Sequence, residues 1–424
     1  YDMGAKVGYF EDFQNINFYL SPRADRTQSM LTTTQAKNKD LRSTTIAMEL
    51  DGGYAPVAVG DDISLVRLPD AQNIVTANNL SGTTYQTTKG VTLDYEYTLN
   101  TRGTASTGTK NELFAHVTNI KVKDETKSLV ETRAGLASFV NQGGDYLVAS
   151  GLAAAEMSAG SRSTAADADG KDGKRPTASA DSAAYQLWAG AGANNMRAES
   201  GSYVDSKGWS LGVGWAREDA KKDGSKLLFS PFIEYGRGTY DSYLDDGTHG
   251  SGKMSYIGVG ILGKLTLQDG MWFEGSVRGG RAKSDYSADL SGTATSYDGS
   301  NTYYGIHLGL GKTFALQEGS AIDGYLRYFW SHQNGMRASV KTGGSADDTF
   351  DFSSVNSHRL RLGLRYSHKD KNAGELYAGL AWEYEFDGKA GATMDGEAAP
   401  SPSLKGASTM LELGYRFMPE NSRV

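Results

Sequence analysis

The second half of the chain alternates between apolar side chains and small or charged ones. Near its end, Leu411, Leu413 and Tyr415 are separated by Glu412 and Gly414. Successive side chains of a β-strand point to opposite faces, so one face of this segment is apolar and the other is not. The pattern recurs and predicts about ten strands. They lie near residues 184–197, 208–219, 225–240, 252–267, 270–286, 302–316, 319–336, 354–370, 373–386 and 405–417.

The connections between these predicted strands alternate in length. Each strand is long enough for the roughly 9–11 tilted residues that cross a bilayer. Short turns are expected at 218–225, 268–270, 316–319 and 367–373. Long polar loops are expected at 240–252, 287–301, 335–353 and 388–404. Short turns on one side and long loops on the other are typical of an outer-membrane barrel.

The polar face of the strands carries charges far from the strand ends. Arg359, Arg361 and Arg365 would share one face of one strand. A soluble sandwich also alternates, but its apolar face points to a core. In a barrel the apolar face contacts lipid and the charged face lines a watery lumen. We therefore expect an all-β, transmembrane antiparallel barrel. Its lumen-facing charges would be Glu234, Lys264, Glu274, Arg278, Asp323, Arg327, Arg359, Arg361, Arg365, Glu383, Glu385, Glu412 and Arg416.

Aromatic residues near the strand ends suit the interfacial girdles of such a barrel. The candidates are Trp209, Trp272, Tyr304, Trp330, Trp382, Phe386 and Phe417. Any single lumen charge could be a solvated wall residue with no role of its own. Taken together, charges of both signs in a narrow lumen would satisfy the polar groups of an inserted helix.

The first half of the chain has a different pattern of apolar and polar residues. Residues 1–123 are polar, with short β-like runs separated by turn-rich pieces, which suggests a solenoid or a sandwich without a clean repeat. Residues 124–157 have apolar residues at mostly helical spacings among good helix formers. Gly143 and Gly144 should interrupt or bend this helix, since glycine is unfavourable in helix interiors. Residues 158–183, rich in Ser, Ala, Asp and Gly, are expected to form a flexible connector.

Composition narrows the function. The mean hydropathy of -0.47 and the 22% of charged residues look soluble, but barrel strands hide lipid-facing residues among polar ones. The lack of Cys excludes disulfides and thiolate metal sites. A net charge of -7 argues against a nucleic-acid partner. No nucleophile elbow, phosphate loop or metal-ligand spacing is present. We therefore expect no catalytic residues, no metal and no cofactor.

Several segments resemble monomeric autotransporters of type Va secretion. They are the helical segment 128–145 and the strand segments 228–236, 273–280 and 404–417. In that family a helix threads the lumen of a twelve-stranded barrel and leads to a secreted passenger, commonly a β-solenoid. The resemblance implies that residues 1–123 are the C-terminal end of a passenger, 124–183 a lumen helix and connector, and 184–424 the barrel. The helix residues expected to touch the lumen wall are Arg133, Phe139, Asn141, Gln142 and Asp145.

The resemblance also implies a function and partners. The chain would be an outer-membrane translocator that exports or displays its own passenger, with its N-terminal part at the cell surface. Its partners would be outer-membrane lipid, its own passenger segment and the barrel-assembly machinery. Alternatives are a porin-like channel for small polar solutes, or the membrane anchor of a surface adhesin or enzyme whose activity lies outside this chain.

Two details depart from the family pattern. The family's last strand usually ends on an aromatic residue, whereas this chain continues to Val424. With about ten strands in place of twelve, we expect the barrel to lack its last two strands and the C-terminal assembly signal. Some family members also cut themselves within the pore helix. Asn141-Gln142 could be such a position, although the motif that those members use does not appear clearly here.

Overall fold

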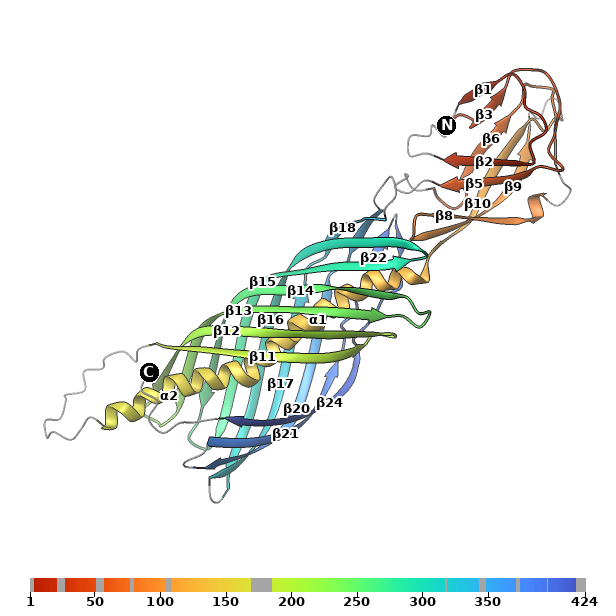
Figure 1. The fold of residues 1–424 in the computed structure, drawn as a ribbon. Coiled ribbons are helices and arrows are strands. Elements are labelled where there is room, and N and C mark those ends of the chain that lie inside the picture. The colour runs from red at the N-terminus through yellow and green to blue at the C-terminus, as the bar shows by residue number, and fades with distance from the viewer. Residues whose placement is uncertain are drawn as a thin grey trace.

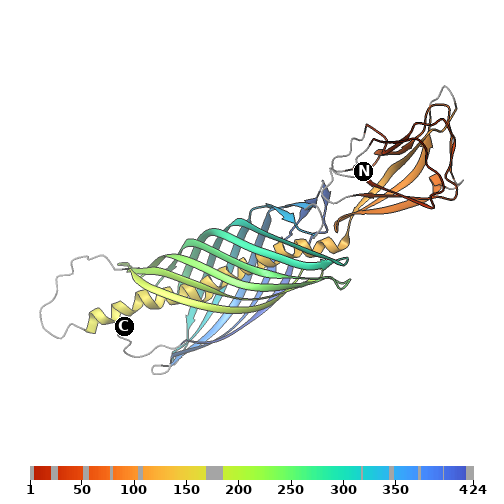
Figure 2. The same ribbon diagram turned by 45° about the horizontal axis from the view of Figure 1, so that its top comes forward.

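A computed structural model describes most of the chain. The described residues are 4–20, 27–50, 57–76, 80–103, 108–168, 185–316, 319–342, 348–370, 374–394 and 396–416. They form an N-terminal β-domain, a long helical segment and a curled sheet that wraps around this segment (Figures 1 and 2). No helix in the described part of the chain is long and apolar enough to cross a membrane.

The N-terminal β-domain winds in parallel coils. One row holds β1 (Ala5–Val7), β3 (Leu31–Thr33) and β6 (Asp62–Arg67), and each strand pairs in parallel with the next. A second row holds β2 (Asn15–Leu20), β5 (Thr45–Leu50) and β8 (Thr84–Lys89) in the same sense. The short strands β4 (Lys39–Asp40) and β7 (Ile74–Val75) form a third row. These rows confirm the solenoid alternative, and we call residues 5–122 the N-terminal solenoid.

A hairpin closes the solenoid on the side of the barrel. The strands β9 (Leu93–Arg102) and β10 (Glu112–Val122) pair with each other, and they also pair antiparallel with β8 and β6. The hairpin thereby joins the two main rows into one sheet in the order β1-β3-β6-β10-β9-β8-β5-β2. The 3-10 turn η1 (Leu80–Gly82) precedes β8. Aliphatic side chains such as Leu65, Leu93 and Leu113 are fully buried between the rows, which form an ordinary apolar core.

The helical segment follows directly. It comprises η2 (Asp124–Thr126), α1 (Lys127–Tyr146), the π-helical turn η3 (Leu147–Gly151) and α2 (Leu152–Ala168). The expected break at Gly143 and Gly144 was wrong, because α1 runs through both glycines. A Cβ atom at Gly143 would lie 2.2 Å from the hydroxyl of Tyr256, so the glycine gives the barrel wall room to approach. The helix also extends to Ala168, beyond the expected end at 157, and residues 169–184 of the expected connector lie outside the described residues.

Ten long strands form the curled sheet in the described part of the chain, which confirms the expected barrel wall. Neighbours in this sheet are antiparallel, and β11 and β24 stand at the two ends of the order. The strands are β11 (Gln186–Glu199), β12 (Tyr203–Ala220), β13 (Lys226–Tyr243), β14 (His249–Thr266), β15 (Met271–Leu290), β16 (Thr293–Ala315), β17 (Ser320–Gln333), β20 (Val355–Asp370), β21 (Gly374–Glu385) and β24 (Gly406–Arg416).

The expected long loops are more ordered than a polar sequence suggests. The segment 287–301 continues β15 and β16 to a tight turn at Ser291 and Gly292, where both residues have positive φ. The expected loop at 240–252 is also mostly strand, because β13 runs to Tyr243 and β14 begins at His249. The loops expected at 335–353 and 388–404 form a small sheet of β18 (Met336–Val340), β19 (Asp348–Phe352), β22 (Ala392–Met394) and β23 (Glu397–Ala398), which we call the loop sheet. Buried Phe350 and Phe352 hold it over the barrel end nearest the solenoid. The loop sheet also touches the solenoid, where the Thr92 hydroxyl donates to Asp348 over 3.1 Å.

The barrel is apolar outside and polar inside. Leu362, Leu364 and Leu413 point outward and are exposed, whereas Arg359 and Arg361 of β20 are buried against the helical segment. One expected girdle residue is misplaced: Trp272 is buried and faces the lumen, next to Lys264 and Arg327. It shares its face with Glu274, because the two residues are two positions apart in one strand.

Candidate functional site

Glycines in the barrel wall receive the large side chains of α1. A Cβ atom at Gly208 would lie 2.6 Å from the ring of Phe139, and Gly238 on the next strand meets the same ring. On β11, a Cβ atom at Gly192 would lie 2.8 Å from the ring of Tyr146. Any side chain at these positions would push the helix away from the wall. The glycines of the inner face thus form sockets fitted to this particular helix.

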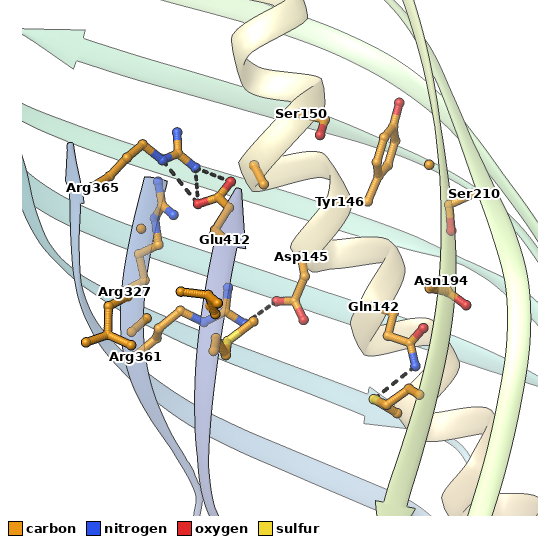
Figure 3. Close-up of a pocket in the computed structure, with 18 of the residues that line it drawn as sticks. Gln142, Asp145, Tyr146, Ser150, Asn194, Ser210, Arg327, Arg361, Arg365 and Glu412 are labelled. Atoms are coloured by element: carbon orange, nitrogen blue, oxygen red, sulfur yellow. Dashed lines mark hydrogen bonds and ion pairs between the residues drawn. The ribbon is translucent and has the colours of Figure 1, made fainter. Parts of the chain in front are cut away.

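Asp145 is the main electrostatic link between α1 and the wall. Its carboxylate accepts hydrogen bonds from Arg359 over 2.9 Å and from Arg361 over 2.8 Å. Both guanidiniums also bind Glu383 on the neighbouring strand β21. Figure 3 shows Asp145 pointing from the helix toward Arg361. Two cations and two carboxylates therefore form one compact, neutral cluster, which we call the Asp145 clamp.

A second cluster, which we call the Arg278 cluster, binds the backbone of the helix. The Arg278 guanidinium donates to Glu234 over 2.9 Å and to the carbonyl oxygen of Val140 over 2.5 Å. The Tyr303 hydroxyl donates to the same Glu234 over 2.6 Å. Arg278 and Glu234 are both buried, so the pair is removed from water. A buried charge needs this complete set of partners, because desolvation alone would disfavour it.

Asn141 lies between the two clusters, in an unbroken turn of α1. Its side-chain amide donates to Ser357 over 3.0 Å and accepts from Ser331 over 2.7 Å. Ser357 in turn donates to Glu385. Gln142, which follows in the sequence, points to Met196 on β11. The amide of Asn141 therefore makes hydrogen bonds through both of its polar atoms to the strands β17 and β20.

The end of α1 nearest the solenoid is held by hydroxyl groups. Glu131 accepts hydrogen bonds from Ser200 over 2.8 Å and from Ser202 over 2.6 Å. Arg133 is fully buried and donates to the carbonyl oxygen of Asn334 over 2.8 Å. Its Nε and Nη1 atoms have no hydrogen-bond partner among the described residues. Arg133 is therefore a cation without a carboxylate partner in the described part of the chain.

The remaining residues expected in the lumen also lie on the inner face. Lys264 pairs with Glu156 of α2 over 2.8 Å, and Arg327 pairs with Glu274 over 2.7 Å. Arg365 pairs with Glu412 over 2.7 Å, which links β20 to β24 without touching the helix. Asp323 accepts a hydrogen bond from Thr313. The side chain of Arg416 lies outside the described residues.

The sequence analysis did not identify several barrel residues that form hydrogen bonds to α1. The hydroxyl of Tyr297 donates to the carbonyl oxygen of Leu129 over 2.7 Å, and Tyr286 donates to Ser128 over 2.8 Å. Tyr240 shares a hydrogen bond of 2.6 Å with Thr132. These tyrosines alternate in phase with the inner face of their strands. The phase was the available signal, but Tyr297 falls in the segment 287–301, which was expected to be a loop.

The helix does not fill the lumen evenly. A cavity of about 460 Å³ lies between α1 and the wall, lined by helix residues, by β11 and by β24 (Figure 3). Gln142, Asp145 and Tyr146 line it from the helix. Within the described residues, no group of His, Asp or Glu is placed to hold a metal ion. The arrangement is a polar inner wall curled around a segment of its own chain.

One known protein family matches the barrel part of the chain. Residues 187–422 match the family model described as the autotransporter β-domain. No curated protein matches the chain. Among solved structures, the chain is similar to the β-domain of the Bordetella autotransporter BrkA, with 19% identity and a TM-score of 0.41, over 55% of this chain and 99% of that chain. It is also similar to the translocator domain of the autotransporter NalP from Neisseria meningitidis, with 17% identity and a TM-score of 0.40, over 64% and 99%.

Proposed function

The chain belongs to the autotransporter family, since the β-domain match covers residues 187–422 of 424, and we propose that it anchors and displays its own N-terminal segment at the cell surface. Its barrel is an outer-membrane translocator for a passenger domain, and the translocator itself is not an enzyme. In this proposal residues 1–123 are the end of the passenger, 124–183 the lumen helix and connector, and 184–424 the barrel.

The continuity of the chain from the solenoid into the lumen carries the proposal. β10 ends at Val122, and α1 begins at Lys127 inside the barrel. The solenoid therefore lies outside one barrel mouth, tethered by a helix that occupies the pore (Figures 1 and 2). A segment that had passed through the barrel and stayed attached would have this arrangement. The partners would be the surrounding lipid, the chain's own passenger and the machinery that assembles outer-membrane barrels.

The lumen contacts support retention of the helix after export. The Asp145 clamp and the Arg278 cluster bind α1 at two heights, and the glycine sockets fix its rotation. Withdrawal of the helix would leave the buried guanidiniums of Arg359, Arg361 and Arg278 without their helix partners. We propose that the lumen-facing charges act together to hold the helix in the pore. No single one of them provides a path for solutes.

The orientation can be tested by labelling single cysteines, because the chain has no Cys. Val59→Cys lies on an exposed turn of the solenoid, and Lys222→Cys lies on the turn between β12 and β13 at the opposite end. We expect a membrane-impermeant maleimide to label Val59→Cys in intact cells and Lys222→Cys only after the outer membrane is permeabilised. Labelling in the reverse order would overturn the proposed orientation.

The porin-like alternative makes a different prediction for conductance. The chain reconstituted in planar bilayers should conduct weakly, and deletion of residues 127–168 should raise the conductance because the helix leaves the pore. The matched control deletes residues 1–122 and keeps the helix, and its conductance should equal that of the whole chain. If removal of the helix leaves the conductance unchanged, the helix does not plug the pore.

A further inference from the structure

Positive side chains are concentrated on one sector of the outer barrel wall. On β12 to β15 the outward-facing apolar belt ends at residues such as Trp209, Tyr235 and Ile257. On the side of the belt nearer the solenoid, the outward positions of the same four strands carry cations. They are Lys207, Arg237, Lys253, Arg281 and Lys283, which we call the basic row.

The register of the sheet aligns the basic row. Lys207 is opposite Thr239, which is opposite Lys253. Arg237 is opposite Ser255, which is opposite Lys283. In each line the cations are two strands apart, about 10 Å, with a hydroxyl side chain between them. The five side chains are exposed, and none of them forms an ion pair with any other described residue.

This lack of partners sets the outer wall apart from the lumen. On the inner face of the same strands, Arg278 and Lys264 each have a carboxylate within 2.9 Å. On the other side of the barrel, the outward positions of β17 and β20 beyond the belt carry Trp330, His332 and His358. The basic row is therefore a local feature of β12 to β15 and not a general property of the rim.

The basic row borders a hollow on the outer wall. The hollow has a volume of about 410 Å³, and Arg237, Lys253 and Lys283 line it together with Tyr235, Ser255 and Ser300. Asp285 and Asp298 line its side toward the mouth. The Asp285 carboxylate accepts a hydrogen bond from the backbone of Lys253 over 2.8 Å, so part of its charge is already engaged. The hollow thus offers cations and hydroxyl donors beside an apolar surface.

We propose that the basic row binds the phosphorylated headgroups of glycolipids in the outer leaflet, with their acyl chains against the adjacent apolar belt. Lysine and arginine near a membrane surface attract anionic headgroups, and their charge-assisted hydrogen bonds to phosphate are strong. Seryl and threonyl hydroxyls between the cations can donate to the remaining oxygens. This inference rests on the proposed function in one respect, because the basic row faces the outer leaflet only if the solenoid is outside.

Binding can be measured on the whole chain in detergent by native mass spectrometry, with bis-phosphorylated lipid A as the probe. The triple variant Arg237→Gln, Lys253→Gln, Lys283→Gln removes the three cations of the hollow. Because each cation near the surface contributes about fivefold, we expect the loss of three cations to weaken binding by about a hundredfold. Dephosphorylated lipid A should bind the unaltered chain as weakly as the phosphorylated probe binds the triple variant.

The matched control removes one arginine and two lysines at the opposite rim, through Arg217→Gln, Lys226→Gln and Lys312→Gln. It changes the net charge equally and should leave the affinity unchanged. Equal binding by the triple variant, an equal loss in the control, or equal binding of dephosphorylated lipid would overturn the proposal. Unchanged tryptophan fluorescence would show that each variant is folded. Affinity in detergent does not depend on orientation, so failure of the Val59→Cys labelling would be a separate result.

Discussion

The solenoid and the barrel use the same alternating pattern in opposite senses. In the solenoid the aliphatic residues point inward, and Leu65 has no exposed surface. In the barrel they point outward, and Leu413 is 74% exposed. The barrel instead buries ion pairs around a helix, as at Asp145 and Arg278. Alternation therefore fixes which residues share a face, but the surroundings of each face decide which one is buried.

The two interiors should consequently fail in different ways. The solenoid interior depends on close packing of apolar groups. Its stability should therefore fall most when a large side chain is replaced by a smaller one. The barrel interior depends on buried charges that have few other possible partners. Its stability should therefore fall most when one member of an ion pair is removed. Tryptophan fluorescence separates the two, because all six Trp residues lie in the barrel. Protease sensitivity of the solenoid provides the second signal.

The largest effect is expected from Asp145→Ala in the barrel interior. The variant leaves Arg359 and Arg361 to share Glu383, and the loss of one partner from a buried ion cluster typically costs about 3–5 kcal/mol. The midpoint of urea unfolding in detergent, followed by tryptophan fluorescence, should fall accordingly. Glu156→Gln is the control, because its pair with Lys264 is partly exposed and should contribute only about 0–1 kcal/mol. Equal midpoints for the two variants would contradict a special role of the Asp145 clamp.

A matched leucine pair tests the apolar faces. Leu65→Ala in the solenoid should cost about 2–5 kcal/mol, because the lost transfer free energy adds to the cavity that remains. Leu362→Ala on the outer barrel wall should cost no more than roughly 2 kcal/mol, because lipid fills the space and only the transfer term is lost. The first should raise protease sensitivity of residues 5–122, and the second should slightly lower the fluorescence midpoint. A larger loss for Leu362→Ala would mean that this face packs against protein.

Local alternation was sufficient to predict the barrel strands. Arginines at 359, 361 and 365 on one side of an apolar stripe indicated which face was the lumen, and the apolar residues opposite them are exposed in the structure. The extension of β15 and β16 was missed because Ser, Asp and Gly residues around Ser291 look like a loop. Their cross-strand pairing and the buried ring of Tyr297 decide otherwise.

Contacts between residues far apart in the chain could not be predicted from the sequence. The solenoid coils pair strands such as β2 and β5, about thirty residues apart, without a repeated motif that would reveal the register. Asp145 was a candidate contact residue, but nothing in the sequence connects it with Arg359 and Arg361. The glycines of α1 were read by helix propensity alone, whereas the approach of Tyr256 and Arg278 determines their role. Packing overrides local preference at these positions.

Replacement of Arg133 should increase the stability of the barrel. Its guanidinium is fully buried without a carboxylate partner among the described residues. Leaving buried polar groups unsatisfied costs about 1–3 kcal/mol, so Arg133→Met should raise the urea midpoint by a free energy of that order. Arg278→Met is the control and should lower the midpoint, because it strands Glu234. If Arg133→Met also destabilises, the hydrogen bonds from Arg133 to the carbonyl oxygens of Asn334 and Ser353 contribute more than the desolvation of its unpaired nitrogens costs.

The smallest effect is expected on the polar exterior of the solenoid. Hydrogen bonds from Arg42 lower the pKa of Asp40 to about 2. Because the folded-state pKa lies below the unfolded value of about 3.9, the pair stabilises the solenoid above that value, and this contribution is lost as the pH falls toward 2. Both side chains are exposed, so the loss should be slight. Asp40→Asn should reduce the difference in protease sensitivity of the solenoid between neutral and acidic solution, while the fluorescence of the barrel stays unchanged. An acid sensitivity identical to that of the unaltered chain would show that this exterior pair, unlike the clusters in the lumen, contributes nothing to stability.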